Sequence, residues 1–427
     1  MAQVDAVRSL ALDLPPSCIA FCPTLSNFFV VGTYYLHGKE QQGDLLLREA
    51  NNNNSNNAEP LSGDPESTPP SPDECVQKRT GSLILFRLEQ DNITRVSTIT
   101  TDFAILDIQW SLHADKVGDT LLAVATSTGL LAFYRLDAAR QELVLSCVKR
   151  ICDSTILVLS LTWHPFRPHV LGLTLSNGNV LLCECNSSSS STEDQLWSQD
   201  AVITTHGIQQ HELEAWTMAF TTQTALTLSG GDDILLQCSQ IQDEGEDMHI
   251  EALWKDRKLH EAGVTAILPL SDTLVVTGSY DDHIRVLSLP SVGRRQTLAS
   301  LYLGGGVWRL KVLAQEKAAV AVPTCQNMQE ASDSALRQPC TSLVLLASCM
   351  HAGARIVRLV RSRDEEWTFE VLARFEEHKS MNYGSDVQPE RKGPGGSGGV
   401  RSIVSTSFYD RLLCLWKIDM AKIVPSN

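Results

Sequence analysis

The feature that most constrains this fold is a short segment that occurs twice in full and once in part. Each copy places a small residue and a turn-forming Asp before an apolar strand, and the partial copy surrounds Asp233. In the full copies an apolar or aromatic residue closes the strand six positions after the Asp, Leu287 after Asp281 and Trp416 after Asp410. Such self-similarity indicates a repeat array in which every repeat must stack on its neighbours.

The fold class predicted from these repeats is all-β. A turn Asp followed by a strand with a closing Trp is typical of WD-type blades, and 427 residues suit seven blades of roughly 40–45 residues each. Alternating apolar residues fit strands that are half-buried between stacked sheets. We therefore predict a single WD40-type β-propeller over residues 1–427 with seven blades.

Turn signals divide the chain into seven expected units, with an early strand at about residues 7–14 completing the last sheet. The units are residues 18–88, 105–136, 157–185, 214–241, 264–289, 307–359 and 367–418. Polar stretches interrupt three of them: residues 38–80, which are Asn- and Pro-rich and expected to be disordered, and loops at 326–338 and 385–399.

Composition narrows the class of partner. The formal net charge of −15 argues against nucleic acid or an anionic membrane as the main partner. No apolar run approaches the ~18 residues of a membrane helix, and the N-terminus has no signal-peptide pattern. The 12 cysteines lack framework spacing, which predicts reduced thiols, several of them in the core, and a cytoplasmic location. A monomer is expected.

Three histidines each precede a turn Asp: His211 before Asp233, His260 before Asp281, and His378 before Asp410. In WD blades such a His commonly hydrogen-bonds the turn Asp and fixes the loop to the sheet. A carboxylate that orients a histidine is also how a general base is built. Spacing does not separate these roles, and we assign the pairs a structural one.

The sixth unit departs from the rule, because its turn has Cys349 and His351 and no Asp. One interpretation is a diverged repeat whose Cys belongs to the core. The other is an activated thiolate, since residues i and i+2 of a strand project to the same side. A zinc site is disfavoured because no second Cys-x-x-Cys pair accompanies them. No metal is expected.

Glycines and aromatic residues add two further candidates. Gly304, Gly305 and Gly306 would let the backbone approach a ligand and present its N–H groups, or would simply form a tight turn. The aromatic candidates lie near blade beginnings beside acidic residues, where they would form a cage for a quaternary ammonium group or pack between blades. They are Trp216, Trp308 and Tyr383, near Glu214, Asp232 and Asp386.

Taken together, these segments resemble one particular WD family over about residues 100–418. The motifs that carry the resemblance are His211-Glu212-Leu213-Glu214-Ala215-Trp216, Gly230-Gly231-Asp232-Asp233, His260-Glu261-Ala262-Gly263, Gly304-Gly305-Gly306-Val307-Trp308-Arg309, Cys349-Met350-His351-Ala352-Gly353, and Glu377-His378-Lys379-Ser380-Met381-Asn382-Tyr383. In order and content they are similar to diphthine methylesterases, the WD-repeat proteins of diphthamide biosynthesis.

The resemblance implies a carboxylic-ester hydrolase that needs no cofactor. Its protein partner would be translation elongation factor 2, on which it would remove the methyl ester of methylated diphthine before the final amidation to diphthamide. The substrate would carry a trimethylammonium group. Two alternatives remain: a non-catalytic scaffold that presents elongation factor 2 to the amidating enzyme, and a ubiquitin-ligase substrate receptor.

Under this hypothesis His351 and Cys349 would supply the nucleophile or an activated water, and Asp386 would orient His351. The N–H groups of the three glycines would stabilise the oxyanion. The substrate-binding residues would be Glu214, Trp216, Gly304, Gly305, Gly306, Trp308, Arg309 and Tyr383.

Overall fold

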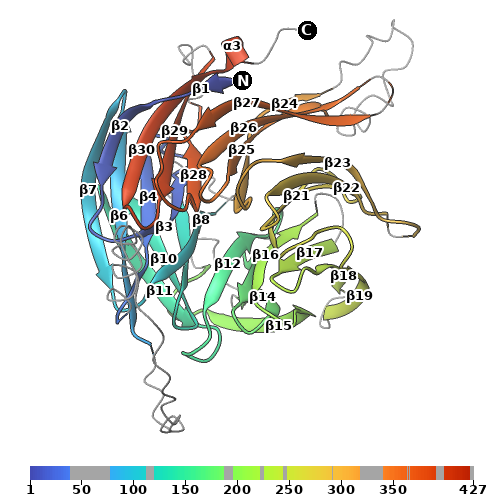
Figure 1. The fold of residues 1–427 in the computed structure, drawn as a ribbon. Helices are drawn as coiled ribbons and strands as arrows, with labels where there is room; N and C mark the ends of the chain where they lie inside the picture. Colours follow the sequence, from blue (N-terminus) through green and yellow to red (C-terminus); the bar gives the residue numbers. More distant parts are fainter. Residues whose placement is uncertain are drawn as a thin grey trace, which may run out of the picture.

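The computed structural model describes residues 1–38, 77–111, 120–186, 196–221, 226–243, 248–290, 292–317, 340–362, 364, 366–390 and 399–423. These residues form seven sheets arranged as a ring around a central axis (Figure 1). The prediction of a seven-bladed, all-β propeller is confirmed.

Every blade has four antiparallel strands that pair in chain order, except that a strand from the N-terminus supplies the fourth strand of the last blade. Two blades carry an additional short strand. Blade 1 contains β3 (Pro16–Phe21), β4 (Phe28–Thr33), β6 (Arg79–Glu89) and β7 (Asn92–Thr101), with β5 (Tyr35–Leu36) beside β6. Blade 2 contains β8 (Ile105–Trp110), β9 (Leu121–Thr126), β10 (Leu130–Asp137) and β11 (Glu142–Arg150). Blade 3 contains β12 (Val158–Trp163), β13 (Val170–Leu175), β14 (Asn179–Asn186) and β15 (Val202–Gln210).

The remaining blades follow the same plan. Blade 4 contains β16 (Ala215–Phe220), β17 (Leu226–Gly231), β18 (Leu236–Asp243) and β19 (Met248–Asp256). Blade 5 contains β20 (Val264–Pro269), β21 (Leu274–Ser279), β22 (His283–Ser288) and β23 (Gln296–Tyr302). Blade 6 contains β24 (Arg309–Lys317), β25 (Cys340–Ser348), β26 (Ala354–Arg361) and β27 (Trp367–Phe375), with β1 (Ala2–Gln3) beside β27. Blade 7 contains β28 (Gly384–Val387), β29 (Val400–Ser407), β30 (Leu412–Asp419) and β2 (Ala6–Ala11), and the helix α3 (Met420–Ile423) follows it.

The first strand of each blade lies innermost. Contacts run from β3 to β8, β12, β16, β20, β24 and β28, and from β28 back to β3, so these seven strands surround the axis. Side chains on their axial faces are therefore brought together from blades that are far apart in the sequence.

The N-terminal strand closes the ring. Strand β2 pairs antiparallel with β30, from Ala6 opposite Trp416 to Ala11 opposite Leu412. This agrees with the expectation that an early strand completes the last sheet. The expected seventh unit, residues 367–418, began one strand too early: β27 pairs with β26 and is the outer strand of blade 6. Since β2 fills the outer position of blade 7, β27 has no place there.

The expected insertions fall mostly outside the described residues. Most of 38–80 and all of 326–338 lie outside them, and β6 already begins at Arg79. The expected loop at 385–399 begins too early, because Gly384–Val387 form the inner strand β28 and pair with β29.

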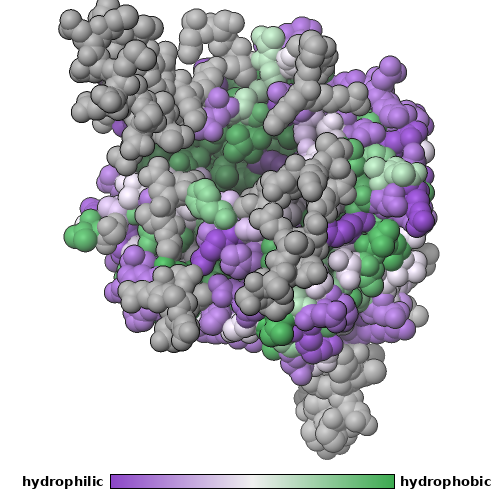
Figure 2. Space-filling model, turned by 180° about the vertical axis from the view of Figure 1, so that it is seen from behind, coloured by the Kyte–Doolittle hydropathy of each residue, from purple (hydrophilic) through white to green (hydrophobic). Residues whose placement is uncertain are grey.

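Apolar side chains fill the spaces between neighbouring blades. One such cluster packs Phe133 of blade 2 against Trp163 and Trp197 of blade 3. Cys183 and Cys185 belong to the same cluster, which confirms that free thiols serve as core residues here. Seen from behind, hydrophobic side chains gather in a hollow in the upper half of the molecule, bordered by hydrophilic ones (Figure 2).

The repeated histidines are structural, as assigned, but they do not all bind the turn Asp. In blade 4, Nδ1 of His211 lies 2.8 Å from Oδ1 of Asp233, and its Nε2 lies 2.8 Å from the Ser229 hydroxyl. In blade 7, Nε2 of His378 lies 2.7 Å from the hydroxyl of Ser405. The feature that these histidines share is therefore the hydrogen bond of Nε2 to a hydroxyl group, and not the bond to the turn Asp.

Blade 5 shows why the His–Asp bond is dispensable. Nε2 of His260 lies 2.8 Å from the hydroxyl of Thr277, while its Nδ1 is buried and has no hydrogen-bond partner. Asp281 instead accepts a hydrogen bond from Arg285 at 2.8 Å. Burial, with a smaller effect of Arg285, lowers the pKa of His260 to about 4. Burial likewise lowers the pKa of His378 to about 4.

These lowered pKa values predict acid sensitivity. An unfolded histidine titrates near pH 6.5, so as the pH falls below that value the unfolded chain takes up protons before the folded one. The stabilising contribution is complete above about pH 6.5 and is lost as the pH falls toward 4. Replacing His378 by Gln should reduce the loss of unfolding free energy between about pH 7 and pH 5 by about 2 kcal/mol, as measured by urea titration. An unchanged loss would contradict the buried neutral state of His378.

Trp416 closes blade 7 and is fully buried. Its ring stacks on Phe375 with 5.1 Å between centroids, and its Nε1 donates to the Ser405 hydroxyl at 3.0 Å. Trp416→Ala should therefore lower the free energy of unfolding by about 3–5 kcal/mol in urea titration. Val202→Ala, at a side chain 65% exposed, is the control and should change it by no more than about 0.5 kcal/mol. Equal effects of the two variants would contradict the core role of Trp416.

Candidate functional site

Four aromatic side chains from four consecutive blades meet at one end of the ring. We call them the aromatic surface: Trp216, Tyr280, Trp308 and Tyr383. Trp308 is central, with ring centroids 5.4 Å from Trp216, 5.8 Å from Tyr280 and 5.2 Å from Tyr383. All four are half-buried and so keep part of each ring accessible. The structure thus brings together the three predicted aromatic residues.

The propeller plan explains why these rings converge. Trp216 is the second residue of the inner strand β16, while Trp308 and Tyr383 directly precede the inner strands β24 and β28. Tyr280 follows β21, whose end lies at the same side as the beginnings of inner strands because neighbouring strands are antiparallel. Sequence reasoning did not select Tyr280 as a site residue, although it stands beside the repeated turn Asp.

Acidic groups border the aromatic surface. Asp232 accepts a hydrogen bond from Nε1 of Trp216 at 3.1 Å. Burial raises the pKa of Tyr280 well above its ordinary value, and the nearby Tyr383, Asp232 and Glu214 raise it further. The Tyr280 hydroxyl is therefore neutral at physiological pH. Electron-rich rings with carboxylates at their border favour a cationic ligand.

The three glycines pack tightly against the turn of blade 6. A Cβ added to Gly305 would lie 2.3 Å from the carbonyl oxygen of Cys349, and one on Gly306 would lie 2.7 Å from Sδ of Met350. Gly304 has a φ of +87°. These observations favour the tight turn over a ligand-binding backbone.

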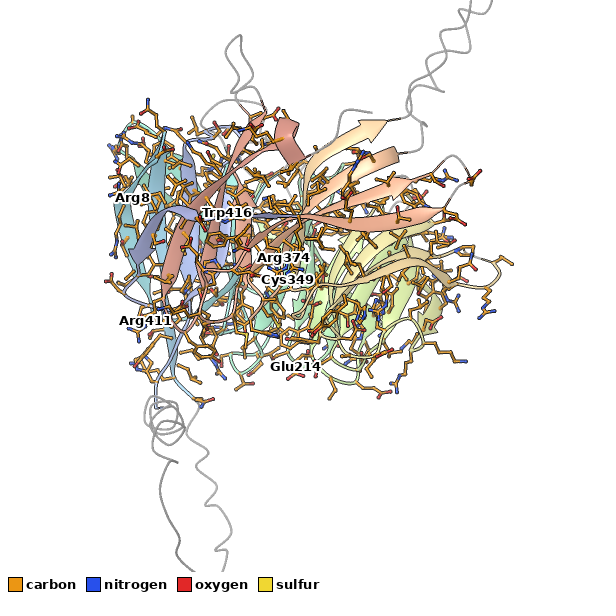
Figure 3. All side chains as sticks on the ribbon, turned by 45° about the horizontal axis from the view of Figure 1, so that its top comes forward. Arg8, Glu214, Cys349, Arg374, Arg411 and Trp416 are labelled. Carbon is orange, nitrogen blue, oxygen red and sulfur yellow. The ribbon has the colours of Figure 1, made fainter. Side chains whose placement is uncertain are left out.

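The Cys–His hypothesis for blade 6 finds little support in the geometry. Cys349 is fully buried, and burial raises the pKa of its thiol to about 12, so it is protonated at neutral pH. Its Sγ lies 3.7 Å from the carbonyl oxygen of Ala347. His351 is exposed on the turn. Figure 3 draws Cys349 inside the body of the ring and Glu214 near its edge.

Other contacts replace the missing turn Asp in blade 6. The N–H of Asn382 donates to the carbonyl oxygen of Met350 at 3.0 Å, forming an isolated bridge between blades 6 and 7. Nη1 of Arg355 donates to the carbonyl oxygen of Ala352 at 2.6 Å. The turn is therefore held by its neighbours, which accounts for the loss of Asp without a catalytic role.

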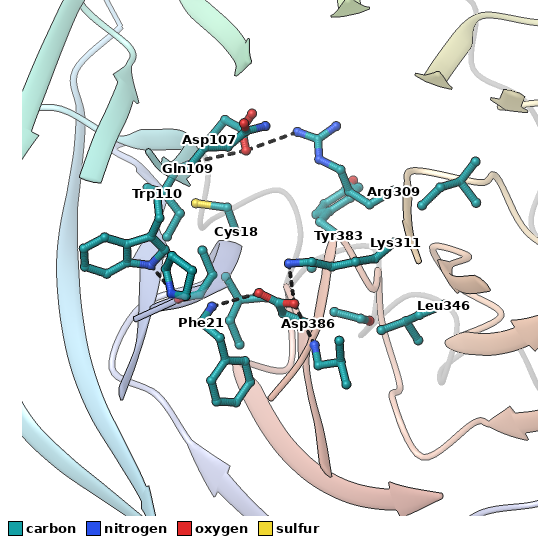
Figure 4. A pocket seen from close by; sticks show the side chains of 18 of the residues that line it. Cys18, Phe21, Asp107, Gln109, Trp110, Arg309, Lys311, Leu346, Tyr383 and Asp386 are labelled. Atoms are coloured by element: carbon teal, nitrogen blue, oxygen red, sulfur yellow. Dashed lines mark hydrogen bonds and ion pairs between the residues drawn. The ribbon is translucent and has the colours of Figure 1, made fainter. Parts of the chain in front are cut away.

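A cavity of about 530 Å³ lies on the axis beside the aromatic surface. The inner strands β24, β28, β3 and β8 line it, and Tyr383 contributes to both the cavity and the aromatic surface. Arg309 points across it toward Asp107, and Lys311 points toward Asp386 (Figure 4).

Asp386 has a structural role in this cavity. It accepts hydrogen bonds from the N–H groups of Val387 at 2.6 Å and of Phe21 at 2.8 Å, and it forms an ion pair with Lys311. The bond to Phe21 links blade 7 to blade 1. With both carboxylate oxygens engaged in this way, Asp386 is not placed to orient His351.

Asp107 and Lys311 are site residues that sequence reasoning missed. Asp107 is a lone acidic residue in the otherwise largely apolar strand Ile105–Trp110, and Lys311 lies two residues after Arg309 on β24. A charged side chain inside an inner-strand pattern was the signal that both offered.

The described residues contain neither a metal-binding cluster nor a membrane-spanning helix. No group of three or more His, Cys, Asp or Glu side chains in the described ranges is arranged to hold a metal ion. None of the helices in that part of the chain has the length and apolar character needed to cross a bilayer.

Comparison with known proteins identifies relatives along most of the chain. No protein-family model matches it. It is 31% identical to the diphthine methyltransferase of Schizosaccharomyces pombe over 348 residues, which cover 81% of this chain and 88% of the relative. It is 24% identical to a diphthine methyltransferase homolog of Dictyostelium discoideum, over 95% of this chain and 97% of the relative. The Homo sapiens diphthine methyltransferase is 26% identical, over 89% and 74%.

Solved structures support the fold alone. The WD40 β-propeller domain of Doa1 superposes with a TM-score of 0.53 at 12% identity, covering 96% of each chain. A chain of the mitotic checkpoint complex superposes with a TM-score of 0.56 at 13% identity, covering 98% of this chain and 93% of that one.

The names of the relatives contradict the expected reaction. A diphthine methyltransferase transfers a methyl group, whereas the sequence was interpreted as that of an esterase removing one. The expected class, carboxylic-ester hydrolase or methylesterase, is therefore wrong, while the WD repeat, the propeller and diphthamide biosynthesis are supported. The roles predicted for His351, Cys349 and Asp386 in ester hydrolysis are therefore not supported by the relatives.

The close packing of the glycine turn can be tested directly. Gly305→Ala forces its new Cβ against the carbonyl oxygen of Cys349, and it should lower the free energy of unfolding by about 1–3 kcal/mol. Gly207→Ala is the matched control, because a Cβ there meets no atom within 4 Å. Thermal unfolding of both variants measures the difference. Equal midpoints would show that the turn has room for a side chain.

Proposed function

Because the chain belongs to the diphthine methyltransferase family, we propose that it binds the diphthine side chain of a protein and takes part in methyl transfer at that residue. The name of the family supports a role in the diphthamide pathway. The aromatic surface is the observation that carries the proposal.

The chemistry of the ligand matches that surface. Diphthine carries a trimethylammonium group, whose diffuse positive charge is attracted to the faces of aromatic rings within about 6 Å. Trp308 offers this contact together with Trp216 and Tyr383, whose ring centroids lie 5.4 Å and 5.2 Å from that of Trp308. Asp232 and Glu214 add negative charge beside the rings. A trimethylammonium group has no N–H to donate, so rings and long-range charge are the means by which a protein can hold it.

The protein that presents this side chain is proposed to be translation elongation factor 2. Its modified histidine would enter from the end of the ring where the inner strands begin, since the aromatic surface lies there. An exposed Tyr409, 70% accessible, extends the same end through Phe408, whose centroid lies 5.5 Å from that of Tyr383. This extension supplies apolar contact for residues that flank the modified histidine.

The described residues contribute binding and orientation of the acceptor side chain. S-adenosylmethionine, the common methyl donor, contains adenosine, and adenosine-containing cofactors are commonly bound at a strand–glycine turn–helix unit. In the described part of the chain the one helix is Met420–Ile423, which has four residues and follows the last strand. Those residues therefore do not form the usual nucleotide unit, and their proposed part is to hold diphthine by its cationic group.

Removing Trp308 tests the recognition step. Trp308→Ala should weaken binding of diphthine-modified elongation factor by about tenfold, since it removes the central ring contact worth about 1–2 kcal/mol. Phe166→Ala is the matched control. The Phe166 side chain is 70% exposed in the turn between β12 and β13, so this variant removes an aromatic side chain from the opposite end of the propeller. Binding is measured by interferometry against modified and unmodified elongation factor. Equal loss in both variants, or no preference for the modified form, would contradict the proposal.

Methyl transfer is tested by mass. Diphthine-modified elongation factor is incubated with the protein and S-adenosylmethionine, and the modified peptide is weighed by mass spectrometry. We expect a gain of one CH₂, because the diphthine carboxylate takes the methyl group of S-adenosylmethionine and S-adenosylhomocysteine is released. Trp308→Ala should slow this gain, and Phe166→Ala should not. An unchanged or reduced mass would contradict methyl transfer while leaving the binding result to stand separately.

A further inference from the structure

The axial cavity holds two cationic side chains next to the aromatic surface. Arg309 and Lys311 are two residues apart on β24, so both project from the same face of that strand into the cavity. Their side chains are 28% and 48% exposed. The carboxylates that face them are far more buried, at 8% for Asp107 and 1% for Asp386. The more accessible charged groups of this cavity are therefore the positive ones.

The two carboxylates are committed to the backbone. Asp107 accepts hydrogen bonds from Ile108 at 3.0 Å and from Leu161 of blade 3 at 3.2 Å. Asp386 accepts from its own neighbour and from Phe21 of blade 1. Both carboxylates thus tie adjacent inner strands together, which fixes their positions independently of Arg309 and Lys311.

Arg309 is only loosely engaged. A guanidinium has five N–H donors. Among the described contacts, Nη2 of Arg309 approaches Asp107 to 3.6 Å, and Nη1 lies 3.4 Å from the carbonyl oxygen of Trp308. The first distance exceeds that of a hydrogen bond, and the second is at its limit. Arg309 also reaches across the axis, because β24 and β8 are separated around the ring by β28 and β3.

The position of Arg309 links the cavity to the aromatic surface. Its guanidinium carbon lies 5.3 Å from the centre of the Trp308 ring, and Tyr383, which packs on Trp308, lines the same cavity. A ligand that places a cation on the rings would therefore have any nearby anionic group within reach of Arg309.

We propose that Arg309 and Lys311 form a carboxylate subsite, so that the ligand of the aromatic surface is a betaine, with a quaternary ammonium group and a carboxylate close together. The ammonium group lies on Trp308 and its neighbouring rings, and the carboxylate accepts paired hydrogen bonds from Arg309, for whose planar fork it is the matching partner. Lys311 adds a point charge two residues further along β24. Asp107 and Asp386 are positioning residues that hold the two cations apart. This inference rests on the proposed function and adds the means by which the acceptor carboxylate is recognised.

Three small probes separate the two halves of the site: glycine betaine, its methyl ester, and tetramethylammonium. Isothermal calorimetry should show that wild-type protein binds glycine betaine about tenfold more tightly than either of the others, since those lack the carboxylate charge. Arg309→Gln should remove this preference, so that glycine betaine and tetramethylammonium bind the variant with similar affinity. Arg95→Gln is the control and should keep the preference. Arg95 lies on the outer strand β7 and forms an ion pair with Asp13.

The outcomes distinguish the inference from the proposed function. If wild-type protein binds all three probes equally, or if Arg309→Gln keeps the preference, the carboxylate subsite is refuted and the aromatic surface remains. If the protein binds none of the probes, both fail. Thermal midpoints establish that each variant is folded, and Arg309→Lys provides a second variant that keeps the charge but loses the planar fork. It should retain less than half of the preference; full retention would refute the paired hydrogen bonds.

Discussion

The closure of the ring by the N-terminal strand is the constraint on which the rest of the structure depends. Strand β2 completes the sheet of β28, β29 and β30, and so joins the first and last parts of the chain in one blade. Blade 7 then rests on blade 1 through the bond from Phe21 to Asp386. Without this closure the inner strands of blades 6, 7, 1 and 2 would not face one another, and neither the axial cavity nor the border it shares with the aromatic surface would exist.

The same plan separates structural chemistry from recognition. Buried polar side chains hold blades together: His211, His260 and His378 bind hydroxyl groups, and Asp107 and Asp386 bind backbone N–H groups of the next blade. Half-buried side chains at the beginnings of inner strands remain accessible. The candidate site therefore consists of the polar and aromatic side chains that are not needed to hold the blades together. Cys349, buried with a raised pKa, lies on the structural side of this division.

The repeated Asp turn and the alternating strands were enough to predict the seven blades, because each is a local pattern. The sheet to which a strand belongs is not a local property. We assigned Trp367–Phe375 to blade 7, because nothing in its sequence tells which sheet it joins. Trp216, Trp308 and Tyr383 were found because equivalent positions of a repeat meet in space. The approach of Arg309 to Asp107 joins strands that are not neighbours in the ring, and no spacing predicts it. The predicted reaction was wrong for another reason: the motifs were matched to diphthine methylesterases, whereas the relatives of this chain are named diphthine methyltransferases.

We propose that the end of the propeller carrying Trp216, Tyr280, Trp308 and Tyr383 receives the cationic group of diphthine. A crystal structure of the protein with a diphthine-containing peptide of elongation factor 2 tests it most directly. We expect the trimethylammonium nitrogen to lie within about 6 Å of the Trp308 ring centre. A peptide bound at the opposite end of the ring, or with its ammonium group in solvent, would contradict it.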